Sequence, residues 1–417
     1  MTTLAQADTV PAGHEGHLPG TPEYRRVLTA LFAAGIATFV LLYDTQALLP
    51  DLTRAFHISP AASTLSVSAA TIGLALALLV FGPLSEAVGR TVLIRFSMAA
   101  SAALAIICAA APNWDSLIAL RLLAGVALAG LPAVATAYLR EEMHPSAQAR
   151  AAGIYIGGTA IGGMAARLVT APIAEAAGWR WALVAAAAVS TACAVVVAVT
   201  LPPSRHFVAT PLRGRTVLAM QRRALADPAL LALYALGACA VGALVAVFNA
   251  VGFRLTGAPF HLGVGLVSLV FLTYPLGTVS STVSGRLADR LGRRAIAPIG
   301  CAVAFAGVLL TLTGSLPVVI IGIAALTVGF FCVHGLASGW VTARSHASGA
   351  SPSQAAAFYL FTYYVGSSVF GSLGGRAWSA DGWPGVVTVA GSLLGIAGVL
   401  ALLLRRMPPL VAPRASG

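Results

Sequence analysis

The sequence predicts an all-α membrane protein whose helices cross the bilayer many times. Of its 417 residues, 58% are hydrophobic and only 9% are charged, and the mean hydropathy is +0.89. A soluble globular protein carries about 25% charged residues, so that class is excluded. The apolar residues form runs of about 20, the length that a helix needs to cross a hydrocarbon core of roughly 30 Å. The alternating segments of about ten residues that are typical of an outer-membrane barrel are absent.

Twelve apolar runs follow one another along the chain, punctuated by proline, glycine and charged residues. The expected spans cover residues 27–49, 62–83, 92–111, 116–138, 149–172, 179–201, 229–252, 263–284, 295–314, 316–341, 354–376 and 384–404. The long connection at 202–228 separates the sixth span from the seventh. We therefore expect two six-helix bundles, residues 24–201 and 229–404, joined by a cytoplasmic linker. Residues 1–23 form a disordered tail in this prediction, and residues 405–417 form a second tail.

The basic residues predict the orientation of the chain. All 25 are arginine, and with both termini placed in the cytoplasm nineteen lie on that side, four lie outside and two lie within spans. Because Lys and Arg accumulate in cytoplasmic loops, both termini are expected to be cytoplasmic. The same bias explains the net charge of +12, so no nucleic-acid partner is expected.

The two halves of the sequence repeat each other. Three residues recur at an offset of 203 and two at 204: Gly82, Gly89 and Arg90 match Gly285, Gly292 and Arg293, and Tyr155 and Trp179 match Tyr359 and Trp383. Two related bundles suit alternating access, in which the halves rock about a site between them.

The segment from Gly285 to Arg294, GRLADRLGRR, resembles the loop signature of the major facilitator superfamily, and GPLSEAVGRT from Gly82 to Thr91 is a looser copy. The order Leu49-Pro50, then Ser59-Pro60, is similar to the bacterial arabinose-efflux-like and acriflavine-sensitivity branch. The resemblance implies twelve spans in two pseudo-symmetric bundles and secondary transport rather than enzymatic activity.

The loop signature has a physical rationale, because glycine permits tight turns and a carboxylate can pair with arginines or with helix ends. We expect a cytoplasmic gate formed by Gly82, Glu86, Gly89, Arg90, Gly285, Asp289, Gly292, Arg293 and Arg294. The simpler alternative is that these arginines only orient the chain.

Charges inside membrane spans are costly and usually functional. Asp44, Arg121 and Arg167 share a depth of about 8 to 12 Å from the periplasmic surface. The resemblance implies that their spans border a central cavity, where Asp44 would exchange protons, and Arg121 with Gly125 resembles a fourth-span signature of proton-driven transport. Two alternatives are a structural Asp44–Arg167 ion pair, with Arg121 reaching the interface, and an anionic substrate bound by the arginines.

Small residues line spans five and eleven, where they allow close helix approach. We expect packing at the interface between the halves for Gly153, Gly157, Gly158, Gly162, Gly163, Gly366, Gly371, Gly374 and Gly375. The Gly-Pro pair that antiporters of the family often carry in span five is missing, since the proline there is Pro172 near the end.

The second half offers polar rather than charged candidates for the cavity: Asn249, Tyr274, His334, Tyr363 and Tyr364. A histidine changes charge near neutral pH, although a single one in a bundle is usually hydrogen-bonded to a neighbour. Gln46 matches Asn249 at the repeat offset, which suggests paired amides in the cavity. Aromatic and amide groups among apolar walls suit a small organic substrate.

The predicted function is proton-coupled efflux of small organic compounds. We expect the protein to act as a monomer in the bacterial cytoplasmic (inner) membrane. Alternatives are proton-coupled uptake or exchange of an anionic metabolite, and a transport-inactive sensor on the same fold. No nucleotide loop, metal-ligand spacing or nucleophile elbow is present, so neither enzyme activity, a cofactor nor a metal is expected. The five cysteines lie in apolar runs and read as packed hydrophobic residues.

Overall fold

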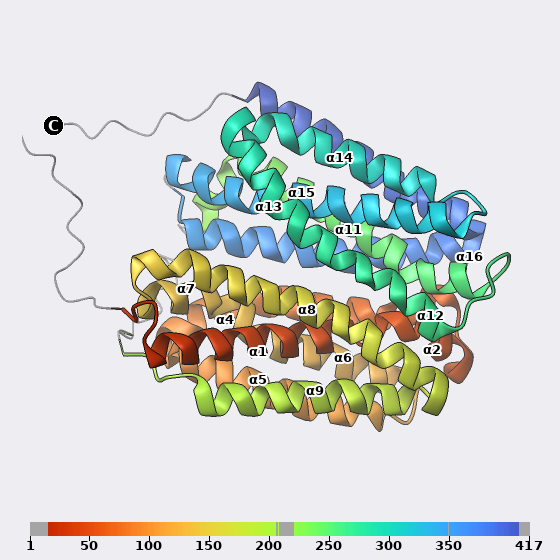
Figure 1. Ribbon diagram of the computed structural model, residues 1–417, viewed down its shortest axis with the longest axis horizontal. Helices are drawn as coiled ribbons and strands as arrows, with labels where there is room; N and C mark the ends of the chain where they lie inside the picture. Colours follow the sequence, from red (N-terminus) through yellow and green to blue (C-terminus); the bar gives the residue numbers. More distant parts are fainter. Residues whose placement is uncertain (1–15, 206, 208–220, 349, 408–417) are drawn as a thin grey trace, which may run out of the picture.

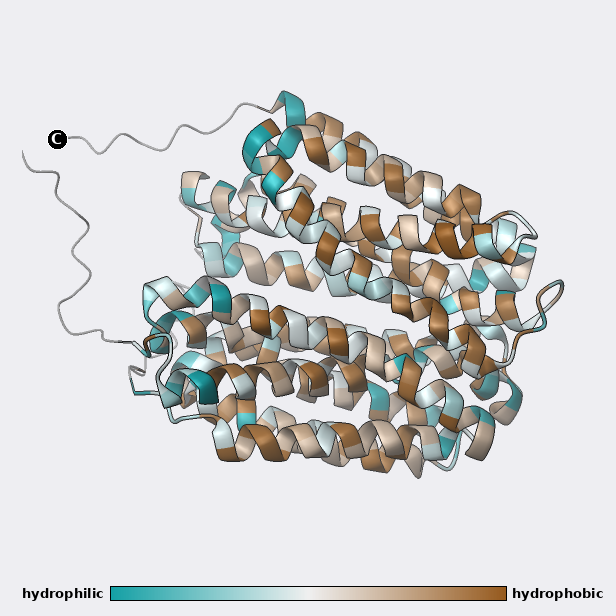
Figure 2. Cartoon of the chain, viewed as in Figure 1, coloured by the Kyte–Doolittle hydropathy of each residue, from teal (hydrophilic) through white to brown (hydrophobic). Residues whose placement is uncertain are grey.

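The computed structural model describes residues 16–205, 207, 221–348 and 350–407, and helices joined by short connections make up most of this described part. The helices run lengthwise in two groups that lie side by side, with the first half of the chain below the second in Figure 1. Hydrophobic residues cover the middle of the helices, and hydrophilic residues gather at their ends (Figure 2). This banding is what a bilayer requires of a protein that spans it.

The first group contains ten helical segments. They are α1 (Pro22–Tyr43), η1 (Gln46–Leu48), α2 (Leu49–Phe56), α3 (Pro60–Ser63), α4 (Leu65–Val88), α5 (Arg90–Ala109), α6 (Trp114–Leu128), α7 (Gly130–Glu142), α8 (Pro145–Ala177) and α9 (Trp179–Thr200). The second group contains α11 (Pro228–Thr256), α12 (Val264–Ser268), η2 (Leu269–Thr273), α13 (Tyr274–Leu291), α14 (Arg293–Leu310), α15 (Leu316–Ser348) and α16 (Pro352–Arg406).

The predicted all-α, twelve-span fold is confirmed in the described part of the chain. Eleven helical stretches are long and apolar enough to cross a membrane, when consecutive pieces are counted together. The last of these, the 55-residue α16, is interrupted at Gly382, whose φ of 62° and ψ of −146° are not helical. The two parts of α16 on either side of Gly382 correspond to the eleventh and twelfth predicted spans.

Four glycines with positive φ make tight connections between helices and reveal the internal repeat. Gly89 joins α4 to α5 and Gly292 joins α13 to α14, with φ of 98° and 85°. Gly178 joins α8 to α9, and Gly382 interrupts α16, with φ of 91° and 62°. A Cβ atom disfavours this conformation, so glycine is needed at each position. We call the end of the molecule that holds Gly89 and Gly292 the Gly89 end, and the opposite end the Gly178 end.

The chain before α1 is ordered where the sequence predicted a disordered tail. The hydroxyl of Thr21 accepts a hydrogen bond from the Tyr24 backbone N–H at 3.2 Å and caps α1, which begins five residues earlier than expected. The His17 N–H donates to the Glu142 carbonyl at 2.8 Å. The prediction was therefore wrong for residues 16–23, because it overlooked the Thr21 cap. Residues 1–15 and the middle of the predicted linker, 208–220, lie outside the described residues.

Glycine contacts pack helices within each half rather than only between the halves, as was expected. A Cβ atom on Gly158 or Gly162 of α8 would lie 2.4 or 2.5 Å from the backbone oxygen of Phe32 or Ile36 in α1. In the second half, Gly366, Gly371 and Gly374 face α11 in the same way, whereas Gly375 faces Thr64 and Ala61 of the first half. Gly153 and Gly157 have nothing within 4 Å of the Cβ position, and Gly163 has only an Arg167 nitrogen at 3.5 Å.

The two halves touch each other through α16 against α3 and α4, and through α12 against α8. Ser68 of α4 and Ser368 of α16 exchange hydrogen bonds, each hydroxyl donating to the other's carbonyl at 3.0 and 2.9 Å. Near the Gly178 end, the Gly265 N–H donates to the Glu175 carboxylate at 2.7 Å. These contacts hold the halves together towards the Gly178 end.

Candidate functional site

The first candidate site is built where α1 stops being helical. The helix ends at Tyr43, and the chain continues through Asp44 into the short η1. Ending a helix leaves its last carbonyl groups without intrahelical donors. Arg121 of α6 supplies donors to two of them, Leu41 O at 2.8 Å and Leu42 O at 3.1 Å.

Arg121 also forms an ion pair with Asp44 at this break. The Arg121 Nη1–Asp44 Oδ1 distance is 2.9 Å, and the Arg121 Nε donates to the Ser66 carbonyl at 3.0 Å. Arg121 is only 1% exposed and Asp44 only 2%. The two expectations of an Asp44–Arg167 ion pair and an interfacial Arg121 were wrong. A shared depth gives a residue's position along the helix but does not determine which neighbour its side chain faces.

Arg167 of α8 is a buried cation held by neutral groups. Its Nε donates to Gln46 Oε1 at 2.8 Å, its Nη2 donates to the same oxygen, and its Nη1 donates to the Gly163 carbonyl. It is 1% exposed, and no carboxylate in the described part of the chain forms an ion pair with it. A buried charge normally requires a partner of opposite sign, so this cation stands apart from the Asp44–Arg121 pair.

Three aromatic rings surround the Arg167 guanidinium. Its Cζ lies 4.6 Å from the centre of the Tyr43 ring, 4.7 Å from that of Phe271 and 5.0 Å from that of Tyr274. Tyr43 belongs to the first half, and the other two rings belong to the second. Cation–π attraction therefore links the halves around a charge that water cannot reach.

Gln46 and Asn249, which the repeat offset predicts to be paired amides, form a hydrogen bond across the seam between the halves. The Gln46 Nε2 donates to Asn249 Oδ1 at 2.6 Å. The direction is fixed, because Arg167 can only donate and so requires the oxygen of the Gln46 amide. Gln46 must then present its nitrogen to Asn249, whose own Nδ2 is buried and has no hydrogen-bond partner among the described residues. The chain Arg167–Gln46–Asn249 thus ends in an unused donor on the second half.

His334 lies in an aromatic group of the second half. Its Nδ1 is 2.9 Å from the Tyr359 hydroxyl, and its ring stacks on Phe330 with an interplanar angle of 8°. The Tyr363 ring lies 4.8 Å from the His334 ring and 5.1 Å from the Tyr364 ring. These contacts agree with a histidine that is hydrogen-bonded to a neighbour.

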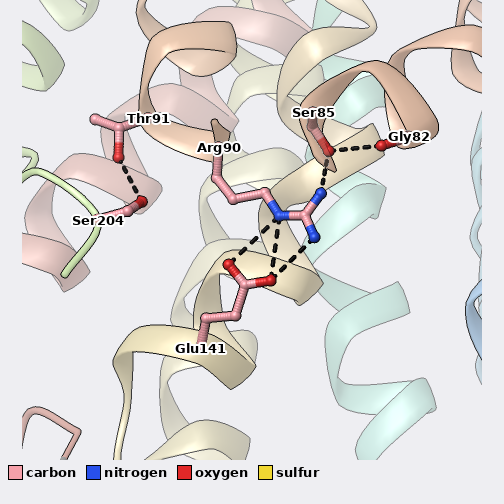
Figure 3. A network of polar contacts seen from close by, with 6 residues as sticks. All are labelled: Gly82, Ser85, Arg90, Thr91, Glu141 and Ser204. Carbon is pink, nitrogen blue, oxygen red and sulfur yellow. Dashed lines mark hydrogen bonds and ion pairs between the residues drawn. The ribbon is translucent and has the colours of Figure 1, made fainter. Parts of the chain in front are cut away.

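At the Gly89 end, Arg90 binds Glu141, a residue that no sequence motif indicated. Its Nη2 lies 2.9 Å from Glu141 Oε1, and its Nη1 donates to the Ser85 hydroxyl (Figure 3). Glu86 forms no ion pair within the described residues. Glu141 lies in the last turn of α7 and belongs to no motif, and its negative charge at the expected cytoplasmic end of the span was the available signal.

The second copy of the loop is more open. Arg293 donates to the Gly339 carbonyl at 3.1 Å and Arg294 to the Arg405 carbonyl at 3.4 Å, while Asp289 has no polar partner within the described chain. Gly82 and Gly285 have open space around the Cβ position. The expected pairing between acids and arginines inside each copy is therefore not formed in this arrangement.

A cavity of about 370 Å³ lies between the halves at the Gly89 end. Glu86, Arg90 and Glu141 line it from the first half, and Ser353 and Gln354 at the start of α16 line it from the second. The molecule is thus hollowed at the Gly89 end, while the inter-half hydrogen bonds described above lie farther towards the Gly178 end.

Comparisons with known proteins agree with this architecture. The family model of the Major Facilitator Superfamily matches residues 27–371. The chain belongs to the major facilitator superfamily. It is 40% identical over 379 residues to the MFS-type transporter YybF of Bacillus subtilis, covering 91% of this chain and 93% of the relative. It is 38% identical over 384 residues to the inner membrane transport protein YnfM of Escherichia coli, covering 92% and 90%.

Solved structures show the same fold at low identity. A bacterial homologue of the human lysosomal transporter Spinster, inward-facing and unoccupied, superposes with a TM-score of 0.73 at 16% identity, covering 93% of this chain and 98% of that one. A variant of the nucleoside transporter NupG gives 0.70 at 15% identity, covering 91% and 98%. The family model and the two bacterial relatives identify this chain as a multi-pass secondary transporter and not an enzyme.

Proposed function

We propose that the protein exports small organic compounds in exchange for protons by alternating access. The observation that carries this proposal is the buried Asp44–Arg121 pair at the break of α1. A carboxylate this deep in a membrane protein is costly, and proton relays are among the few uses that retain one. The second half has Val247 at the position that the repeat offset of 203 assigns to Asp44, so the acid serves the first half alone.

Proton uptake would change the contacts of Asp44 more than those of Arg121. A protonated Asp44 loses its charge and with it most of the attraction to Arg121. Arg121 keeps its three carbonyl acceptors, Leu41, Leu42 and Ser66, so it remains at the end of α1. The segment from Asp44 to η1, which carries Gln46 and its bond across the seam, is then free to move. Protonation is in this way coupled to the contact between the halves.

The distribution of arginines supports a cytoplasmic Gly89 end, which would make the present arrangement inward-facing with both termini in the cytoplasm. The inner membrane is the proposed location, as for the Escherichia coli relative, and a monomer in the arabinose-efflux-like branch is the proposed form. The two loop copies and Glu141 would close the Gly89 end in the opposite state.

The test is proton exchange in proteoliposomes loaded with a pH-sensitive dye. Growth of a deletion strain on a panel of toxic organic compounds supplies the transported compound. Wild-type protein should move protons when that compound is added, whereas Asp44→Asn should lose proton movement and keep exchange of labelled for unlabelled compound. Unchanged gradient-driven accumulation in Asp44→Asn would remove Asp44 from the mechanism.

A second candidate, proton-coupled uptake or exchange of an anionic compound, is favoured by one observation. Within the described part of the chain, the buried cation Arg167 has no carboxylate partner, and the Asn249 Nδ2 close to it in the hydrogen-bond chain has no acceptor. An anion bound between the halves would provide both a counter-charge for Arg167 and an acceptor for the Asn249 Nδ2. In that case Arg167→Met would abolish transport of anions, and an imposed pH gradient would drive accumulation of a labelled monoanion by wild-type protein.

A further inference from the structure

A groove on the side of the molecule lies between α4 and α16, away from the candidate site. Its volume is about 430 Å³, and its walls are apolar side chains of both halves, among them Leu65 and Ile72 of α4 and Val369 and Leu373 of α16. The side chains of Leu65, Val369 and Leu373 are 42%, 54% and 41% exposed. Because these helices cross the bilayer, the groove opens to lipid.

Arg376 lies at one end of this groove and is the one charged residue among its described lining residues. It is exposed and forms no hydrogen bond or ion pair within the described residues. It precedes the reversal at Gly382 by six residues, so it lies about 9 Å from the end of its span, where lipid headgroups begin. An arginine at this depth reaches towards the headgroups while its stem stays in hydrocarbon.

We propose that the groove binds one anionic phospholipid, with an acyl chain between α4 and α16 and the phosphate on Arg376. An acyl chain gains little from the groove, because the bilayer is as apolar as the groove walls. Selectivity must therefore come from the headgroup, where a guanidinium pairs with phosphate through two parallel hydrogen bonds. A zwitterionic headgroup carries a positive charge beside its phosphate, so an anionic lipid is preferred.

The bound lipid also bridges the two halves. Ser68 of α4 and Ser372 of α16 share a hydrogen bond of 2.8 Å in the lining of the groove. A lipid that contacts both helices adds to this contact and stabilises the arrangement in which the halves meet along α4 and α16. Anionic lipid is thus expected to change the transport rate as well as to bind.

The test is native mass spectrometry of the full chain in a neutral detergent, titrated with dioctanoyl phosphatidylglycerol or dioctanoyl phosphatidylcholine. The wild-type protein should bind the anionic lipid about fivefold more tightly than the zwitterionic one, which is the effect of one arginine near an anionic headgroup. Arg376→Gln should remove that preference. Arg54→Gln is the matched control, since Arg54 is also near the Gly178 end but is 71% exposed and paired with Asp51.

A second pair of variants tests the acyl-chain site. Val369→Trp fills the groove and should weaken binding of both lipids, whereas Val399→Trp, on the 57% exposed Val399 of the second part of α16, should not. An unchanged preference in Arg376→Gln, an equal loss in Arg54→Gln, or full binding by Val369→Trp would overturn the proposal. Displacement of phosphatidylglycerol by glycerol phosphate would show a free-anion site and would also overturn it.

Discussion

Arg121 joins three parts of the first half through four contacts. It forms an ion pair with Asp44, donates to the Leu41 and Leu42 carbonyls at the end of α1 and donates to the Ser66 carbonyl of α4. The ion pair and the helix break are therefore one structure, since the break creates the carbonyls that the guanidinium uses. The residue that stabilises the end of α1 is therefore also the partner of the carboxylate for which we propose proton exchange.

This arrangement predicts unequal costs for its two charged members. Arg121→Gln should lower the free energy of unfolding by about 3–5 kcal/mol. It leaves a buried carboxylate without a counter-charge, and it removes the donors to the last carbonyls of α1. Asp44→Asn should cost less, since Arg121 keeps three acceptors. Thermal unfolding in detergent measures both, with the exposed Arg54→Gln as a control worth less than about 1 kcal/mol. Equal costs for the two substitutions would contradict the assignment.

Gln46 gives a second prediction at this scale. Gln46→Glu places a carboxylate where Arg167 now finds a neutral oxygen, so the melting temperature should rise or stay unchanged. Asn249 would then turn its amide to donate through Nδ2. Gln46→Leu removes the acceptor of a buried cation and should lower the melting temperature. A loss of melting temperature in Gln46→Glu as large as that in Gln46→Leu would contradict the claim that the Gln46 oxygen stabilises the Arg167 cation.

The sequence located the buried charges but not their partners. Asp44, Arg121 and Arg167 were recognisable because charges are rare in apolar runs, and helical rise placed them at one depth. The rotation of each helix about its axis is set by packing, so the choice of Arg121 over Arg167 for Asp44 could not be predicted. Glu141, Tyr359, Tyr43 and Phe271 were missed for the same reason, because each acts through a contact from another helix.

At the scale of helices, α1 and α8 pack backbone to backbone through glycine. Because Gly158 has no Cβ atom, the Phe32 carbonyl of α1 packs directly against its backbone. An added Cβ atom would lie only 2.4 Å from the Phe32 carbonyl oxygen. Gly157, one residue earlier, has open space at the same position. Neighbouring glycines of one helix thus have different roles, which the sequence spacing alone did not distinguish.

The two glycines give a matched test. Gly158→Ala should destabilise the protein by about 1–3 kcal/mol, because α1 and α8 must separate to admit the methyl group. Gly157→Ala should be neutral or should stabilise by about 0.5–1 kcal/mol, since alanine favours the helix. Thermal unfolding of both purified variants in the same detergent checks this. A loss of stability in Gly157→Ala as large as that in Gly158→Ala would refute the close packing of α1 on α8.

The spans themselves were predictable, whereas their breaks were not. Apolar runs of sufficient length are a sequence property, and the reversals at Gly89 and Gly292 were visible as repeated glycines. The break of α1 lies at the polar stretch Asp44-Thr45-Gln46, but apolar residues on both sides make hydropathy predict one continuous span over 27–49. It is stabilised by Arg121 from another helix, so only the folded protein reveals it.

At the scale of the whole molecule, the halves are held together towards the Gly178 end and hollowed at the Gly89 end. Glu175 of the first half receives the Gly265 N–H of the second, and a Cβ atom on Gly265 would lie 2.7 Å from that carboxylate. Because Glu175 is exposed and flexible, Gly265→Ala should displace its carboxylate, break the hydrogen bond from the Gly265 N–H and so loosen the Gly178 end. Gly314→Ala, at a connection of the same end with open space around it, should not. Spin-label distances across this end measure the change, and no change in Gly265→Ala would contradict the contact.

The central claim, that the halves rock as two bodies about the seam, is tested most directly by two distances measured in one sample series. Spin labels at Thr136 and Ser353 report on the Gly89 end, because these two residues line the same cavity from different halves. Labels at Ala61 and Ser379 report on the Gly178 end, where the Ala61 N–H lies 3.3 Å from the Ser379 hydroxyl. On addition of a transported compound or of acid, the first distance should shorten while the second lengthens. Two distances that stay fixed, or that change in the same direction, would contradict alternating access in this protein.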